Sequence, residues 1–450
     1  MLEDIQSKNL VKTFLSYSIP CIIGMLLTSC ITIVDGLFIG WKLGEKGLAA
    51  VNLTLPVLFL LLAVTIMVGV GGVTLGAQCL GAKDSKKANQ HFTFSVIVNA
   101  AAITVMALVL ILFQDRIISM LNAKGEMFGY VKSFLGTMAY FYVFMMVNNT
   151  FSMFIRSEGK PQLSLMFGIA GNILNVILDY IFIMKLDFGM KGAAFASGIS
   201  VLIPFLFGIL YFTSKKSVYK FTKIKFEMQN LKTILFFGSA EFVAQVSSSI
   251  TVFAFNWILL KRMGVNGVAA MTIVGYISFI QNMILTGIAI GIHPIISYSF
   301  GAKNRDTILN LFSIAVKAVL TVGIAVFAVS FIAADPIVRI FAKDNLQLVE
   351  TAKDGLKLYA VAFLLNGYNI IAAAYFTSLG EAKAAAIIST LRSLVLVIGF
   401  VVVLPYLLGN TGIWLTAPMT EITTFVVAYI FISKSKAKLL LSETGQSLPA

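Results

Sequence analysis

The feature that most constrains this chain is a series of long apolar runs separated by short polar gaps. The runs centre near residues 27, 65, 103, 143, 174, 202, 246, 282, 321, 364, 395 and 422, and a helix needs about 20 apolar residues to cross a bilayer. Hydrophobic residues make up 58% of the sequence and charged residues only 12%, against about 45–50% and 25% in a globular domain. The sequence therefore predicts an all-α membrane protein with twelve transmembrane helices.

The basic residues indicate how the chain is oriented in the membrane. Its net charge of +14 is spread over short gaps rather than gathered on one water-facing surface, so it does not indicate a nucleic-acid partner. Roughly 19 Lys and Arg residues fall on the side that holds both termini and roughly 13 on the other side. Because cytoplasmic loops carry an excess of Lys and Arg, we expect a multi-pass protein of the cytoplasmic (inner) membrane with both termini in the cytoplasm.

The chain repeats itself at an offset of about 220 residues. Gly81-Ala82-Lys83-Asp84 aligns with Gly301-Ala302-Lys303-Asn304, and Gly47-Leu48-Ala49-Ala50 aligns with Gly267-Val268-Ala269-Ala270. Each half holds six predicted spans, an even number, so the halves are parallel repeats related by a pseudo-two-fold axis along the membrane normal. Such pairs of bundles are typical of secondary transporters. We expect an N-terminal lobe, a basic cytoplasmic loop between the lobes and a C-terminal lobe, over residues 1–213, 214–232 and 233–450.

Four acids lie within the predicted spans: Asp35, Asp179, Glu241 and Glu421. A carboxylate at the bilayer centre costs about 2.5–3.5 kcal/mol on insertion scales, so each acid needs a partner or a function. Asn172, Asn175 and Asp179 lie at i, i+3 and i+7, on one stripe of the fifth helix. Their oxygens suit Na+ and equally suit a protonated acid in a hydrogen-bond network. The structural alternative is a polar stripe that holds this helix to its neighbour.

The two N-terminal acids are absent from the second repeat. Asp35 maps to Phe255 and Asp179 maps to Gly399. Because scaffold features recur in both repeats, this asymmetry places ion coupling in the N-terminal lobe. Pro20 precedes Asp35 on the first helix, where it can kink the helix.

The C-terminal half carries a second set of polar residues within its spans: Glu241, Gln245, His293, Arg392 and Glu421. Arg392 is a candidate partner of either Glu241 or Glu421. A structural ion pair and an acid of a substrate cavity fit this pattern equally well. His293 precedes Pro294 and fits a packed neutral ring or a titrating group.

The chain lacks the motifs of a membrane enzyme. No HExxH, GxSxG or Asp-rich metal motif occurs, and the sequence contains only two histidines. Its three cysteines form no CxxC pair, so neither a disulfide scaffold nor a zinc site is indicated. We expect no catalytic residues and no resident cofactor.

Short segments between roughly residues 10 and 435 carry a recognisable pattern. They are Val34-Asp35-Gly36-Leu37-Phe38-Ile39-Gly40, Gly47-Leu48-Ala49-Ala50-Val51, Gly81-Ala82-Lys83, Arg156-Ser157-Glu158-Gly159-Lys160-Pro161, Asn175 to Asp179, Gly192-Ala193-Ala194 and Ser299-Phe300-Gly301-Ala302-Lys303-Asn304. With them the chain resembles the multidrug and toxic-compound extrusion (MATE) family, and within it the bacterial twelve-helix multidrug pumps.

The resemblance implies the fold of the MATE/MOP superfamily, with two six-helix lobes. It also implies a cation site, with H+ or Na+ held by Asp35, Asn175, Asp179 and Ser197, and a helix-bending role for Pro20. Asn172 lies on the same stripe. The chain departs from the family at two points. It lacks an acid on the tenth helix, where the nearest polar residues are Asn366 and Asn369, and it has His293 where related pumps often carry Gln.

The function that the resemblance implies is antiport. Inward flow of Na+ or H+ would drive amphipathic organic cations outward by alternating access, from a monomer in the lipid bilayer. A flippase of the same superfamily, acting on lipid-linked precursors, is the first alternative, and a polytopic membrane enzyme acting on lipids is the second. Only Lys317 and Arg392 are basic residues within spans, against four acids, which favours cationic cargo over an anionic lipid carrier.

Overall fold

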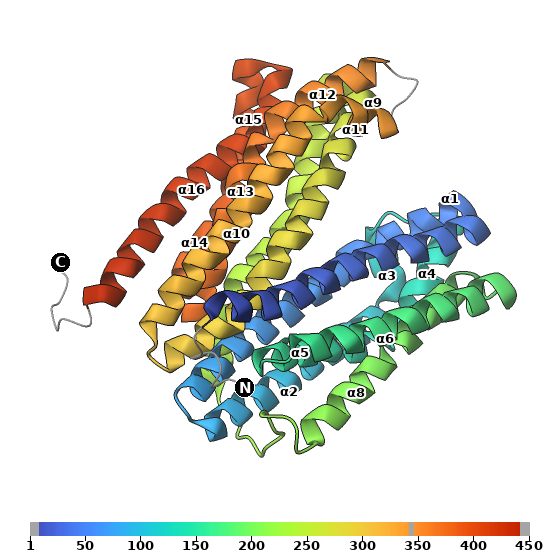
Figure 1. Cartoon of the computed structure of the whole chain (residues 1–450). Helices are drawn as coiled ribbons and strands as arrows, with labels where there is room; N and C mark the ends of the chain where they lie inside the picture. Colours follow the sequence, from blue (N-terminus) through green and yellow to red (C-terminus); the bar gives the residue numbers. More distant parts are fainter. Residues whose placement is uncertain (1–8, 342–345, 442–450) are drawn as a thin grey trace. The chain divides into compact units, whose positions relative to one another are not determined.

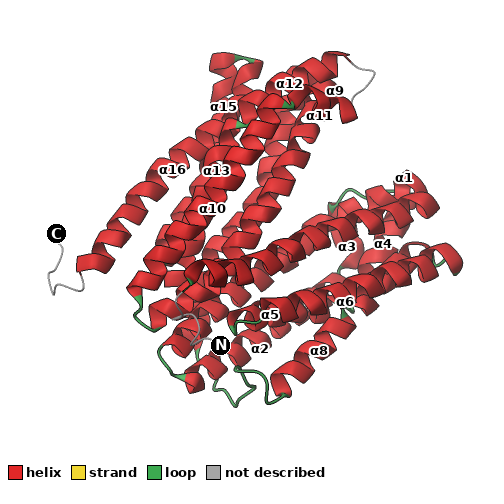
Figure 2. Ribbon diagram, in the orientation of Figure 1, coloured by secondary structure: helices red, strands yellow, loops and turns green. Residues whose placement is uncertain are grey.

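The computed structural model describes residues 9–341 and 346–441, and every regular element within those ranges is helical (Figure 2). The helices form two compact units. The first unit holds residues 19–238, and the second holds the residues from 239 onward together with residues 9–18. The chain therefore passes from the second unit to the first within its first helix, two residues before Pro20.

The first unit is built from helices that follow one another through short turns. In chain order they are α1 (Leu10–Gly81, whose first residues belong to the second unit), α2 (Ser85–Leu112), α3 (Gln114–Met120), α4 (Glu126–Met138), α5 (Tyr142–Ser157), α6 (Pro161–Asp179), the π-helical segment η2 (Tyr180–Lys185), α7 (Gly189–Ser200) and α8 (Leu202–Thr213).

The second unit repeats this order. Its elements are α9 (Met228–Gly301, whose first residues belong to the first unit), α10 (Arg305–Ile332), α11 (Ala334–Phe341), α12 (Leu346–Tyr359), α13 (Val361–Leu379), α14 (Ala382–Thr390), the π-helical segment η3 (Leu391–Val395), α15 (Leu396–Leu408) and α16 (Asn410–Leu441). Within this unit α13 packs between α10 and α16, and the three run side by side in Figure 1.

The helices of the described residues account for twelve membrane crossings. Ten helical segments are long and apolar enough to cross a membrane, and two of them, Met228–Gly264 and Asn266–Gly301, are the parts of α9. The bent pair α4 and α5 can make an eleventh segment. Straight, the 72 residues of α1 would span about 108 Å, more than three times the bilayer core of about 30 Å. Because α1 breaks at Gly44, where φ is 66° and ψ is −161°, it makes two crossings.

The two units share backbone details at the 220-residue offset. Gly264 breaks α9 with φ 62° and ψ −157°, as Gly44 breaks α1. Asp84 caps α2 by accepting a hydrogen bond from the Lys87 backbone nitrogen at 3.0 Å, and Asn304 caps α10 in the same way. The bond to Lys87 holds the pKa of Asp84 below its ordinary value. The predicted internal repeat is thus visible in the geometry of each unit taken by itself.

The start of α9 belongs to the first unit because it packs closely on the second half of α1. A Cβ atom added at Gly71 would lie 2.0 Å from the carbonyl oxygen of Ile234, and one added at Gly238 would lie 1.9 Å from that of Met67. Only glycine permits such an approach of two backbones. Ile234 completes a small core with Val68 there. Residues 228–238 are therefore held on the first unit rather than on the helix bundle that follows.

Candidate functional site

The first unit brings two acids from distant parts of the chain together. Asp35 lies on α1, between Pro20 and the break at Gly44, and Asp179 is the last residue of α6. Their carboxyl groups lie within hydrogen-bonding reach of each other. Asp179 is only 1% exposed, and Asp35 is half-buried. Two neighbouring carboxylates repel each other, and a shared proton or a bound cation relieves that repulsion.

Three polar atoms of this site lack partners among the residues that the structure describes. They are Asp35 Oδ1, Asn175 Nδ2 and Asp179 Oδ2, all of them buried. Buried polar groups in folded proteins are almost always paired, and each exception calls for an explanation such as a bound water, an ion or a functional role. Asn175 lies one turn before Asp179 on the same face of α6. The two unpartnered carboxylate oxygens are of the hard type that accepts a proton or Na+, whereas the third atom, Asn175 Nδ2, is a hydrogen-bond donor.

The backbone changes its winding immediately after Asp179. Residues Tyr180–Lys185 form the π-helical segment η2, a geometry that occurs often at functional sites. Helix α6 packs against α7, which carries Ser197. Within the described ranges the Ser197 hydroxyl makes no hydrogen bond to Asn175 or Asp179, and its carbonyl accepts one from Ser200. Ser197 and Asn172 are half-buried, so the structure places them on the right helices without drawing them into the acid pair.

The second unit holds a different polar cluster, in which every charge is paired. Arg392 lies in η3 and contacts Glu421 on α16, with 2.8 Å between Nε and Oε1. Asn369 donates to Glu421 Oε2 at 2.7 Å, and Arg392 donates to Asn366. The arginine thus pairs with Glu421, one of its two predicted partners. The two asparagines occupy the positions nearest the missing tenth-helix acid.

The remaining candidates of the second unit lie on α9 outside that cluster. Glu241 and Gln245 are half-buried near the start of the unit, one helical turn apart. His293 is half-buried and precedes the buried Pro294. Their assignment to a substrate cavity stays a prediction.

A buried carboxylate that sequence reasoning did not single out lies at the end of α5. Glu158 is 1% exposed and accepts hydrogen bonds from the Tyr211 hydroxyl at 2.6 Å, from the Tyr219 backbone nitrogen at 3.0 Å and from Ser217. Burial raises the pKa of Tyr219, which keeps its phenol protonated. Glu158 therefore fixes the segment between α8 and α9 to the first unit. The sequence holds one indication of this role, because Glu158 lies in one of the segments that carry the family resemblance.

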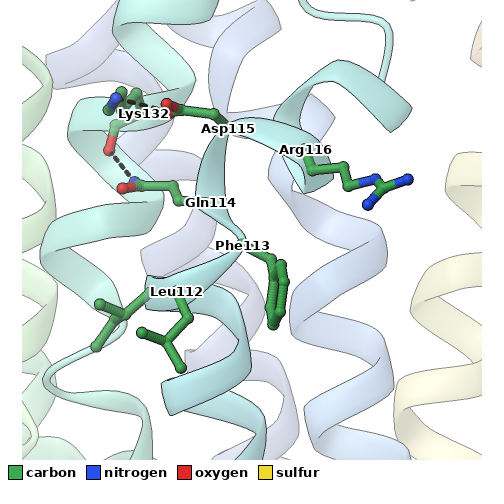
Figure 3. Close-up of a pocket in the computed structure, with 7 residues that line it drawn as sticks. Leu112, Phe113, Gln114, Asp115, Arg116 and Lys132 are labelled. Atoms are coloured by element: carbon green, nitrogen blue, oxygen red, sulfur yellow. Dashed lines mark hydrogen bonds and ion pairs between the residues drawn. The ribbon is translucent and has the colours of Figure 1, made fainter.

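A surface pocket of about 340 Å³ lies where α2 gives way to α3, away from all of these residues (Figure 3). Asp115 forms an ion pair with Lys132 at 2.7 Å, and Gln114 donates to the Lys132 carbonyl at 2.8 Å. These contacts join α3 to α4. The pocket contains none of the predicted site residues.

Comparison with known proteins gives the same family for both halves of the chain. The sequence model of the MatE family matches twice, over residues 20–181 and 241–403. The chain is 28% identical over 431 residues to the multidrug export protein MepA of Staphylococcus haemolyticus, covering 95% of this chain and 94% of the relative. It is 26% identical over 444 residues to MepA of Staphylococcus saprophyticus, covering 97% and 98%.

Solved structures agree in fold. A crystal structure of MATE in the bent conformation aligns with a TM-score of 0.89 at 25% identity, covering 98% of this chain and 99% of the other. An outward-facing multidrug resistance MATE family transporter of the MOP superfamily also gives a TM-score of 0.89, at 24% identity over 97% and 98%. The prediction of an all-helical MATE/MOP fold is thereby confirmed. With the doubled match across its sequence, the chain belongs to the MatE family and is a multi-pass membrane transporter of the multidrug and toxic-compound extrusion type, not an enzyme.

Proposed function

We propose that this transporter exports amphipathic organic cations and that inward flow of H+ or Na+ through the first unit drives the export. The observation that carries the proposal is the Asp35–Asp179 pair with its unpartnered buried oxygens. A site of this kind binds one proton or one cation strongly, because binding relieves the repulsion between the carboxylates. Each charge moved inward across 100 mV supplies about 2.3 kcal/mol, and antiport can use this free energy.

The kinship supports a multidrug substrate range. The relatives in both Staphylococcus species are named multidrug export proteins. Cationic cargo is favoured by the charges of the second unit, where Glu421 neutralises Arg392 and Lys317 is exposed on α10. Neither residue offers an unpaired cation within the bundle of its unit. A flippase for anionic lipid carriers needs several such cations, so the charge pattern weighs against that alternative.

The N-terminal cation site is proposed to comprise Asp35, Asn175 and Asp179. Asn172 and Ser197 stand nearby on α6 and α7 as further candidates. Pro20 is proposed as the bending point of the first helix. It removes one backbone hydrogen bond from α1 and lies two residues beyond the point at which the chain changes units.

The test is efflux of ethidium, a fluorescent organic cation, from proteoliposomes under a Na+ gradient alone and a proton gradient alone. We expect one gradient to drive efflux in the unmodified protein. Asp179→Asn and Asp35→Asn each remove one carboxylate of the pair, so both variants lose gradient-driven efflux by about tenfold or more.

The matched control is Asp354→Asn, which makes the same substitution at an exposed acid of α12 and leaves efflux unchanged. Gradient-driven efflux that survives both pair substitutions would show that coupling does not pass through this site. Failure of ethidium efflux under both gradients, together with transport of a lipid-linked precursor, would favour the flippase.

A further inference from the structure

The segment between the two halves is a structured strap rather than a free linker. We call residues 214–227 the strap; it joins the end of α8 to the start of α9. The Lys220 backbone nitrogen donates to Asn89 Oδ1 at 2.9 Å, and the Thr222 nitrogen donates to Thr93 Oγ1 at 3.1 Å. Asn89 and Thr93 lie one turn apart on α2. The strap is therefore fixed along the beginning of α2.

From residue 221 to residue 225 the exposure of the strap alternates from one residue to the next, as in an extended chain. Tyr219 is fully buried and packs edge-on against Phe154, with ring centroids 5.0 Å apart. Beyond it, Phe221, Lys223 and Lys225 are exposed, whereas Ile224 packs into the core around Val68 and Ile234. The exposed face of the strap thus carries Lys223 and Lys225, whereas the ring of Phe221 packs on the buried Phe92, with ring centroids 5.0 Å apart.

The two exposed lysines of the strap border a pocket of about 290 Å³ between the strap, the start of α2 and the first turn of α9. The pocket is lined by Gln90, His91, Phe94, Lys223, Ile224, Lys225, Glu227 and Asn230. Its single acid, Glu227, accepts a hydrogen bond from Asn230 at 3.1 Å. Lys223 and Lys225 form no ion pair with any residue of the described ranges, so two lysines against one acid leave the pocket lining with an excess of positive charge.

We propose that this pocket binds the phosphate-bearing headgroup of an anionic phospholipid. Clusters of four to eight Lys or Arg immediately beside a membrane helix are the sequence pattern of anionic-lipid binding, and six lysines lie between residues 215 and 232.

A lipid is favoured over free phosphate by the surroundings of the pocket. Because the strap joins two helices that are long and apolar enough to span a membrane, we expect it at headgroup depth. Phe226 is 65% exposed beside the lysines, and an exposed apolar ring at this depth contacts the boundary between headgroups and acyl chains. Phe226 stacks on Phe94, with ring centroids 5.6 Å apart, which fixes it beside the pocket. The site is preformed because the hydrogen bonds to α2 hold the strap in place.

The experiment is a binding titration of the purified full-length protein in a neutral detergent. The probes are short-chain dioctanoyl phosphatidylglycerol, dioctanoyl phosphatidylcholine and inorganic phosphate. We expect phosphatidylglycerol to bind at least tenfold more tightly than phosphatidylcholine. The pocket variant Lys223→Gln/Lys225→Gln reduces the affinity for phosphatidylglycerol by about thirtyfold, since two lysines near the headgroup contribute about 1 kcal/mol each.

Two further variants make the result specific to the pocket. Lys215→Gln/Lys216→Gln removes the same charge from exposed positions of the same strap, and it changes the affinity less than twofold. Lys223→Arg/Lys225→Arg keeps the charge and retains binding. An equal loss of affinity in the two glutamine variants would show that the lipid is attracted by the overall charge of the strap and not bound in the pocket, and it would overturn the proposal. Equal affinity for the two lipids would also overturn it, and displacement of phosphatidylglycerol by inorganic phosphate in the same concentration range would assign the pocket to free phosphate.

Discussion

Glu158 is held from two directions, by Tyr211 at the end of α8 and by Ser217 and Tyr219 of the strap. Lys160 adds a cation at 4.0 Å, and its ammonium group also donates to the Lys216 carbonyl at 2.7 Å. One buried carboxylate thereby accepts hydrogen bonds from donors that would otherwise lack a partner. A carboxylate that accepts several hydrogen bonds in a buried place cannot be replaced by an isosteric amide without leaving a donor unpaired.

Glu158→Gln is therefore expected to destabilise the protein by about 1–3 kcal/mol, because the new amide nitrogen faces a donor instead of accepting from it. Thermal unfolding of the purified variant in detergent measures the effect as a lower midpoint. The control is Glu350→Gln on the exposed face of α12, which leaves the midpoint unchanged. If both variants melt alike, Glu158 does not hold the strap.

Residue-scale inference from the sequence reached the stripe of Asn172, Asn175 and Asp179 because helical periodicity alone sets which residues share a face. It could not place Asp35 beside Asp179, since periodicity does not say which helix lies opposite; the family resemblance supplied that expectation. For the same reason the partner of Arg392 stayed open between two acids. The charged residues and the glycine around Glu158 are typical of a solvent-exposed turn. Glu158 is buried because the strap folds over it, and the sequence pattern does not show that contact.

At the scale of elements, α1 and α9 are each interrupted by a glycine with positive φ. The conformation at Gly44 and Gly264 is available essentially to glycine alone, and no atom lies within 4 Å of a Cβ placed at either position. Glycine is therefore required at these two positions by the backbone conformation and not by a lack of space for a side chain. Its recurrence in both units, together with the paired caps Asp84 and Asn304, follows from the repeat that the sequence shows.

Gly44→Ala and Gly264→Ala are expected to cost about 1–3 kcal/mol each, since alanine must adopt a strained φ and ψ there. Gly168→Ala in α6 and Gly275→Ala in α9 are matched controls, because their Cβ atoms also meet open space but their backbone is helical. Those controls are neutral or stabilising by up to about 1 kcal/mol. Thermal melts of the four variants decide the matter, and equal midpoints would mean that the breaks are ordinary helix bends.

The limits of the sequence at this scale appear at the start of α9. Hydropathy shows where an apolar run begins, and the division after residue 232 followed from it. The contacts of Gly71 with Ile234 and of Gly238 with Met67 are backbone approaches between helices far apart in the chain. They carry no periodic signal, so the attachment of residues 228–238 to the first unit was not predictable. The division of the chain at residues 213 and 233 stays a proposal.

At the scale of the whole molecule, the distribution of basic residues predicts the orientation in the membrane. The strap and the turns at Lys83 and Lys303 all fall on the side with more Lys and Arg, which we propose is the cytoplasm. Green fluorescent protein fused to the C-terminus is then expected to fluoresce, and alkaline phosphatase fused there is expected to be inactive. A phosphatase fused after Asn122 in the turn between α3 and α4 is expected to be active. The reverse pattern would invert the topology and place the lipid pocket in the outer leaflet.

The assignment of residues 9–18 to the second unit has a consequence for synthesis. These residues leave the ribosome well before the rest of their unit, which begins about 220 residues later in the chain. At about 5–20 residues per second, the interval is about 11–44 s. The first turns of α1 are therefore made before the helices against which they pack, although the rest of α1 can already join the first unit. The second unit can therefore be completed only after synthesis has passed residue 239, when residues 9–18 meet the rest of that unit.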